Sequence, residues 1–132
     1  MIGWRTAKLE GVANVLGGGT PSRRQSTYFG GAIPWATPTD VTALDGIYIS
    51  KAKEAITDEG LQNSSAKLMP AGAVLLTSRA TIGYTAVAEV PICTNQGFVN
   101  FVSGPDLVPE FLAYWLRTQK TKLIQHAGAY DI

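Results

Sequence analysis

The second half of the chain alternates between short apolar runs and polar, glycine-containing turns. Three runs, at residues 73–77, 84–90 and 97–102, are rich in β-branched and apolar side chains. Runs of this length that are bounded by turns are typical of β-strands. A shorter run at residues 47–49 has the same character. The pattern therefore predicts three strands and a fourth, shorter one.

Apolar positions at helical spacing occur near the C-terminal end. They predict a helix from about residue 109 to residue 125. The side chains expected to face the core are Val108, Leu112, Trp115, Leu116, Leu123 and Ile124. A second helix is predicted after Thr57, because a hydroxyl at the N-cap followed by acids stabilises a helix start. We expect that helix to end near residues 64–65.

Two other segments are predicted to be less regular. Residues 9–15 form a short amphipathic piece, expected to be a helical turn that passes into a strand. Residues 33–40 contain Pro34 and Pro38, which disfavour a helix interior and a central strand. This segment is predicted to run extended along a sheet edge, with Trp35 anchoring it to the core.

The composition is that of an ordinary globular protein, with 45% hydrophobic and 16% charged residues. We expect one α+β domain over residues 1–132, with a twisted, mostly antiparallel sheet, a few helices and long loops. Cys93 is the single cysteine, which favours a reducing environment. No apolar run approaches the ~18 residues of a membrane span. We therefore expect a soluble, cytoplasmic protein that has no membrane partner.

The net charge of +1 hides an uneven distribution. Basic residues gather near both ends of the chain, and between residues 68 and 110 the one positive charge is Arg79. Basic groups that face few acids suit nucleic-acid phosphates. A solvated surface explains the terminal groups equally well.

The turn around Arg79 and the amide pair Asn95–Gln96 are candidates for DNA recognition. Guanidinium and carboxamide side chains have the geometry to read base edges. The turn, which also holds Thr81, either contacts a base or phosphate or is a hairpin turn with an exposed arginine. Asn95 and Gln96 either pair with adenine or cap the ends of strands.

The glycine-rich loop at residues 17–22 is a second candidate. It lacks the spacing of a phosphate-binding loop and of a dinucleotide-binding loop. It is either a structural turn or a loop that contacts the DNA backbone. The side chains assigned to phosphates in the second case are Thr20, Ser22, Arg23 and Arg24.

No group of residues predicts catalysis. Cys93 and His126 are the sole cysteine and histidine, and neither has a second ligand at metal-binding spacing. The acids at residues 40–45 and 54–59 are better explained as helix caps and solvated surface. A small enzyme built on Cys93 or on these acids is an alternative without an evident substrate. We expect no catalytic residue, no metal and no cofactor.

Seven segments follow one another in a specific order. They are Trp4 with LEGVA (9–13), GGTPS (18–22), YFGG (28–31), IPWATPTD (33–40), ITDEGLQNSSAK (56–67), LTSRATIG (76–83) and TNQGF (94–98). Their combination resembles the target-recognition domain of the specificity (S) subunit of type I restriction-modification systems. The resemblance spans about residues 4–128.

The resemblance implies a role and partners. A full specificity subunit carries two such domains, separated by long spacer helices, and each domain reads one half of a split double-stranded DNA site. The subunit is non-catalytic, because methyl transfer belongs to modification (methyltransferase) subunits and cleavage to a restriction subunit that this chain would meet indirectly. No heptad run replaces the spacer helix here, so we expect one recognition domain, from a truncated chain or a partial gene product. The alternative function is a protein-interaction module that binds modification subunits or regulates assembly without binding DNA alone.

Overall fold

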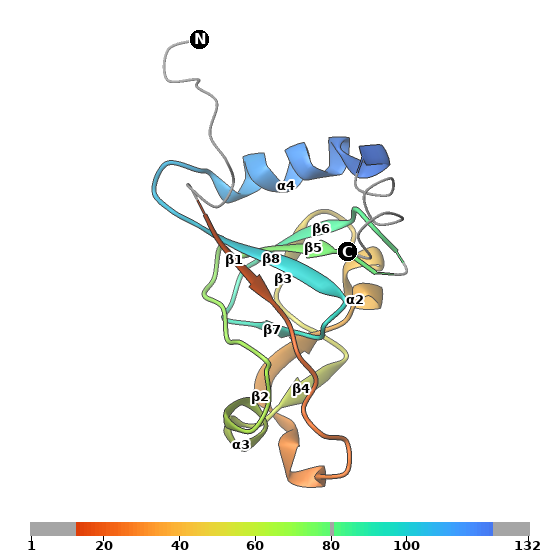
Figure 1. Cartoon of the computed structure of the whole chain (residues 1–132), viewed down its shortest axis with the longest axis vertical. Coiled ribbons are helices and arrows are strands. Elements are labelled where there is room, and N and C mark those ends of the chain that lie inside the picture. Colours follow the sequence, from red (N-terminus) through yellow and green to blue (C-terminus); the bar gives the residue numbers. More distant parts are fainter. Residues whose placement is uncertain (1–12, 80, 123–132) are drawn as a thin grey trace.

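The computed structural model describes residues 13–79 and 81–122, which form two β-sheets with helices packed around them (Figure 1). The strands are β1 (Ala13–Gly17), β2 (Phe29–Ala36), β3 (Tyr48–Ile49), β4 (Glu54–Ile56), β5 (Val74–Thr77), β6 (Thr85–Ala88), β7 (Cys93–Thr94) and β8 (Phe98–Ser103). The helices are the 3-10 turn η1 (Ser26–Tyr28), α2 (Pro38–Thr42), α3 (Asp58–Gln62) and α4 (Pro109–Thr118). The predicted α+β class, with mostly antiparallel strands, is confirmed.

The larger sheet has the strand order β1-β8-β5-β6-β3. Its pairs are antiparallel except for β3, which runs parallel to β6. The three apolar runs of the second half correspond to β5, β6 and β8, and the shorter run corresponds to β3. Every residue of β5 and β6 is buried. Burial on both faces explains why these strands are nearly continuous apolar runs.

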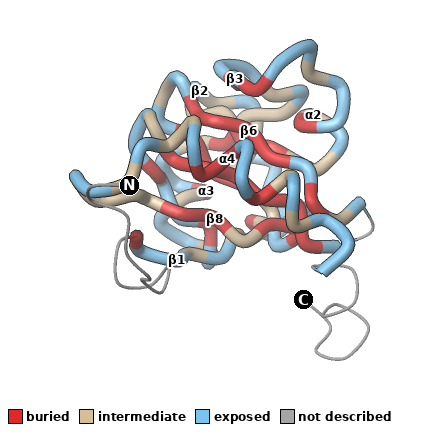
Figure 2. The backbone as a smooth tube through the Cα atoms, turned by 90° about the horizontal axis from the view of Figure 1, so that it is seen from above, coloured by how far each residue is buried: buried red, intermediate tan, exposed pale blue. Residues whose placement is uncertain are grey.

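Helix α4 covers one face of the larger sheet, and Figure 2 shows buried stretches of β6 and β8 beside it. Val74, Leu76 and Val87 pack against Leu112 and Leu116 on this face. Alternate residues of the same strands point to the opposite face, because side chains alternate along a strand. There they join a second cluster that includes residues of α2 and of the segment around Ile92.

The smaller sheet has the order β4-β2-β7, so β2 is its central strand. The prediction that residues 33–40 run along a sheet edge is therefore wrong. Pro34 is tolerated because the parallel partner β7 pairs with β2 at Trp35 and Ala36, after the proline. In the antiparallel pairing with β4, alternate residues exchange hydrogen bonds, which leaves positions that need no N–H. Trp35 is 2% exposed, as expected for an anchor in the core.

Helix α2 is absent from the sequence prediction, although its start carries a recognisable signal. Thr37 is the N-cap, Pro38 is the first helical residue and Asp40 lies at the third position. The Thr37 backbone N–H donates to the Asp40 carboxylate at 2.8 Å. Helix α3 begins as predicted, since the Gly60 N–H donates to the Thr57 hydroxyl at 3.0 Å. It ends at Gln62, slightly earlier than expected.

Helix α4 begins as predicted but buries a narrower stripe than expected. Leu112, Ala113 and Leu116 are buried, whereas Trp115 is 43% and Val108 61% exposed. Successive residues of a helix are about 100° apart, so Trp115 lies outside the stripe that Leu112 and Leu116 define. The predicted helical residues 123–125 and the segment 9–12 lie outside the described residues. No helix in the described part of the chain has the length and hydropathy to cross a membrane.

Candidate nucleic-acid interface

Three loops from distant parts of the sequence meet at the ends of strands. They are residues 17–22, residues 95–97 and the turn formed by residues 78–79 and 81–83, here called the Arg79 turn. The Gly19 N–H donates to the Thr94 carbonyl at 3.0 Å, and the Ser78 N–H donates to the Gly97 carbonyl at 2.9 Å. Backbone hydrogen bonds therefore join the segment 94–97, the loop and the last residue of β7 before it, to both other loops. All three lie along the same side of the molecule in Figure 1.

The loop 17–22 is held by a hydrogen bond from the buried Trp35. Its indole N–H donates to the Gly19 carbonyl at 2.9 Å. A Cβ atom added at Gly18 would lie 1.9 Å from the Asn95 carbonyl oxygen, so this position has room for glycine alone. The loop therefore packs backbone against backbone on residues 94–95, which defines its position at the surface.

Thr20 and Gln96, predicted to contact phosphate and base respectively, touch each other. The Thr20 hydroxyl donates to Gln96 Oε1. The Gln96 side chain is exposed to solvent. The contact engages the carboxamide oxygen of Gln96 and leaves its amide nitrogen without a partner among the described residues.

Asn95 lies in the same loop but has a structural contact of its own. Its side-chain Oδ1 accepts a hydrogen bond from the Gly97 N–H at 2.8 Å. Such a bond closes a local turn in which the asparagine side chain mimics the backbone. Of the two roles left open by the sequence, this geometry favours the cap at a strand end, because bidentate pairing with adenine also uses the carboxamide oxygen.

The Arg79 turn is closed by Thr77 at the end of β5. The Gly83 N–H donates to the Thr77 carbonyl at 3.0 Å, and the Tyr84 N–H donates to the Thr77 hydroxyl at 3.0 Å. Thr77 is fully buried, whereas Arg79 and Thr81 are exposed. Within the described residues, Arg79 has no carboxylate within ion-pair distance. The turn thus presents an uncompensated guanidinium on a rigid base.

Arg23 differs from Arg79 because it is already paired. Its guanidinium forms a two-bond contact with the Glu54 carboxylate, at 2.9 and 3.1 Å. It also lies over the Phe29 ring, 4.9 Å from the centroid, and near Trp35. The hydrogen bond from Arg23 lowers the pKa of Glu54. Arg23 is therefore held away from solution anions more firmly than its neighbour Arg24.

Ser22 and Arg24 lie in the exposed stretch that follows the loop 17–22. The Arg24 backbone N–H donates to the Ser22 hydroxyl at a long 3.4 Å. No carboxylate pairs with Arg24 in the part of the chain that the structure describes. Ser22 and Arg24 thus stay available for a phosphate, and of the four residues assigned to phosphates they are the least engaged.

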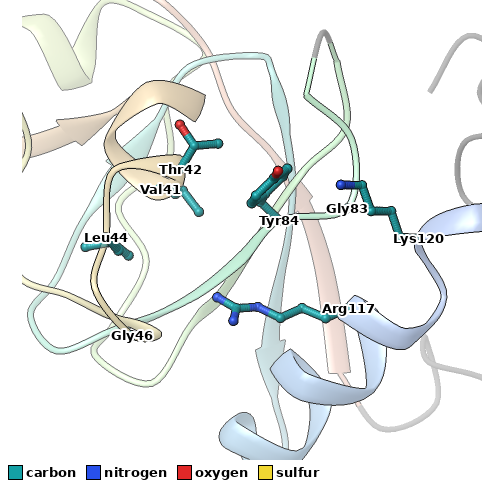
Figure 3. Close-up of a pocket in the computed structure, with 8 residues that line it drawn as sticks. All are labelled: Val41, Thr42, Leu44, Gly46, Gly83, Tyr84, Arg117 and Lys120. Atoms are coloured by element: carbon teal, nitrogen blue, oxygen red, sulfur yellow. The ribbon is translucent and has the colours of Figure 1, made fainter.

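A cleft that the sequence did not predict opens beside the Arg79 turn. Its volume is about 310 Å³, and its walls come from α2 and the residues after it, from Gly83 and Tyr84, and from the end of α4. Figure 3 shows Arg117 and Lys120 reaching from the α4 side into the space that α2 and Tyr84 border. Arg117 lies in the last turn of α4 and Lys120 shortly after it, and the fold brings both to the cleft beside the turn.

Cys93, the one cysteine considered as a catalytic group, lies in β7. Cys93 is fully buried, and burial raises the pKa of its thiol to about 11, so it is a neutral thiol at physiological pH. His126 lies outside the described residues. Residues 13–79 and 81–122 contain no group of three or more His, Cys, Asp and Glu that could hold a metal ion.

Comparison with known proteins connects this geometry to a family. Over residues 1–132 the chain matches the type I restriction modification DNA specificity domain. It is 42% identical over 116 residues to the type I restriction enzyme MjaIX specificity subunit of Methanocaldococcus jannaschii, covering 88% of the chain and 27% of that subunit. It is 24% identical over 131 residues to the EcoR124I/EcoR124II specificity subunit of Escherichia coli, covering 96% and 31%.

A solved structure has the same fold. The HsdS subunit from Thermoanaerobacter tengcongensis matches with a TM-score of 0.73 at 26% identity, covering 93% of the chain and 29% of that subunit. The chain spans between 27% and 31% of the length of these three relatives.

Proposed function

Because the chain belongs to the family of type I restriction modification DNA specificity domains, we propose that it recognises one half of a bipartite site in double-stranded DNA and has no catalytic activity of its own. Catalysis would belong to partner subunits. The observation that carries the proposal is the meeting of three loops on one side of a rigid β scaffold, with Arg79, Thr81 and Gln96 exposed on them.

The size of the chain supports a half-site. A compact chain of this length has a radius of gyration of roughly 14 Å. Its width is then comparable to the ~34 Å of one turn of B-DNA. One face of such a body meets one segment of major groove with its flanking phosphates. A longer recognition sequence would need a second domain at a fixed distance, which raises the effective concentration of each domain at its site.

The contacts divide between bases and phosphates. Arg79 is assigned to a base edge, with Thr81 and Gln96 beside it. Asn95 is assigned to a contact near the same base edge through its amide nitrogen, because its Oδ1 already accepts from the Gly97 N–H. Thr20 and Ser22 are assigned to phosphates together with Arg24, while Arg23 reaches a phosphate only if it leaves Glu54.

Selection of binding sites from randomised duplexes tests this division. Arg79→Ala should relax preference at one base position, since a good bidentate contact discriminates by ~1–3 kcal/mol. Arg24→Ala, the matched arginine control, should weaken all duplexes alike and flatten the salt dependence. Equal losses on every sequence for both variants would contradict the assignment of Arg79 to a base.

A second role, contact with modification subunits, is favoured by the outer face of α4. Trp115 is 43%, Tyr114 54% and Val108 61% exposed. Neighbouring exposed aromatic side chains are typical of protein interfaces. The same selection, run with and without a modification subunit, separates the two roles. If sequences are selected only when the modification subunit is present, the result would favour the interaction module over independent DNA recognition.

A further inference from the structure

In the described part of the chain, the cleft beside the Arg79 turn is lined by basic side chains and by no acidic side chain. The basic side chains are those of Arg117 and Lys120. Asp45 lies in the adjacent loop between two lining residues but is not itself part of the wall. Among the described residues the one ion pair is Arg23–Glu54, so both cations of the cleft lack a carboxylate partner there.

Arg117 is held in place by hydrogen bonds that use part of its donor set. Its Nε–H donates to the Thr85 hydroxyl at 2.9 Å, and an Nη2–H donates to the Thr85 carbonyl at 2.8 Å. Thr85 is itself tied to α4, because its hydroxyl donates to the Ala113 carbonyl at 2.9 Å. A guanidinium has five N–H donors. Two of them fix the group to β6, and the remainder are available to a ligand in the cleft.

Lys120 is positioned by packing rather than by hydrogen bonds. Its ammonium lies 4.4 Å from the centroid of the Tyr84 ring, within the range of a cation–π contact. Its side-chain stem packs on Gly83, where an added Cβ atom would lie 2.8 Å from Lys120 Cγ. The end of the Arg79 turn and the Lys120 side chain therefore occupy fixed positions relative to each other.

We propose that this cleft binds a phosphate of the DNA backbone next to the base pair that the Arg79 turn reads, with Arg117 and Lys120 as the phosphate-binding side chains. The inference rests on the proposed function. Two fixed cations without a carboxylate suit an oxyanion, and an arginine with free donors forms strong charge-assisted bonds to phosphate. Because Gly83 belongs to both the turn and the cleft wall, a phosphate bound here fixes the register of the turn in the groove.

The test measures duplex affinity against salt concentration for the whole chain and for Lys120→Gln. Loss of one phosphate contact should make the slope of log K against log[salt] less negative by ~0.9 and weaken binding about tenfold at ~0.05 M salt, on all sequences alike. Lys51→Gln is the matched control. Lys51 follows β3, and Ile49 of β3 pairs with Ala88 of β6. Ala88 is the end of β6 that is farther from Gly83, so Lys51 lies away from the cleft. Lys120→Arg keeps the charge and should keep the slope, and melting curves confirm that each variant is folded.

Several results would overturn the inference. If Lys120→Gln and Lys51→Gln have equal slopes while the chain still selects a sequence, the phosphate site is wrong and the proposed function stands. A change of preference at one base pair with an unchanged slope would make Lys120 a base contact instead. Inorganic phosphate that binds the chain without weakening duplex binding would place the anion site away from DNA. Absence of any duplex binding by the unaltered chain would remove the proposed function and this inference together.

Discussion

Replacing Gly18 by alanine should separate two of the three loops and destabilise the fold. An added Cβ atom would lie 1.9 Å from the Asn95 carbonyl oxygen and 2.4 Å from the Thr94 hydroxyl. The nearest atom belongs to the backbone, so no side-chain rotation relieves the clash. The backbone of residues 17–22 must move away, and the hydrogen bond from the Gly19 N–H to the Thr94 carbonyl is lost with it.

The magnitude follows from two contributions. Forcing extra volume into a packed site costs about 1–3 kcal/mol. A lost backbone hydrogen bond adds about 0.5–1.5 kcal/mol. The sum is about 1.5–4.5 kcal/mol. With an unfolding entropy of about 2.1 cal/mol/K per residue, 132 residues give roughly 0.28 kcal/mol/K, so the melting temperature should fall by about 5–16 °C.

Thermal unfolding followed by circular dichroism measures this, and Gly17→Ala is the matched control. Gly17 is adjacent, exposed, and has nothing within 4 Å of an added Cβ atom. Its replacement should leave stability unchanged or raise it slightly, since alanine restricts the unfolded chain. The Gly18 variant should also lose sequence preference in duplex selection. Equal melting temperatures for the two variants would refute the claim that the loops are held by close backbone packing.

Two further substitutions probe the charged and the buried groups. Glu54→Gln should release Arg23 and change the free energy of unfolding by less than about 1 kcal/mol, because the pair is exposed. Duplex binding should tighten on all sequences. Unchanged affinity in a gel-shift titration would mean that Arg23 does not reach DNA. Cys93→Ala tests the buried thiol, whose pKa is raised from 9.0 to about 11. The folded state holds the thiol proton more tightly than the unfolded state does. The contribution of this thiol to the free energy of unfolding is therefore fully present below pH 9 and is lost as the pH rises towards 11, a change of about 2–3 kcal/mol in all. Urea unfolding at pH 8 and pH 10.5 should show a larger loss for the unaltered chain than for the variant, and parallel losses would contradict it.

The strands that the sequence predicts best are those buried on both faces. Residues of β5 and β6 contact α4 on one side and the second cluster on the other, so their apolar character is continuous and easily recognised. The central position of β2 depends instead on pairing with β4 and β7, which are distant in sequence. Prolines favour an edge strand, because they lack a backbone N–H for a second neighbour. In β2 the pairing with both neighbouring strands overrides that local preference.

The exposure of the candidate residues was predictable from the sequence, but their contacts with one another were not. The exposed side chains of Arg79, Thr81 and Gln96 follow from turn signals that the sequence carries. The contact between Thr20 and Gln96 joins positions 76 apart, and the pair Arg23–Glu54 joins positions 31 apart. No periodicity or spacing encodes such pairs, because they depend on the pairing of β1 with β8 and of β2 with β4.

A buried amide indicates why these loops hold their positions. Asn100 in β8 is fully buried, and its side-chain N–H donates to the Thr94 hydroxyl at 2.9 Å. Its Oδ1 has no hydrogen-bond partner in the described part of the chain, a cost of about 1–3 kcal/mol. An apolar residue here would avoid that cost but would not orient Thr94, whose carbonyl receives the Gly19 N–H. The polar contact therefore aligns two loops from inside the core. Since the exposed side chains of Arg79 and Gln96 are not part of that core, substitutions at these two positions should leave the scaffold unchanged.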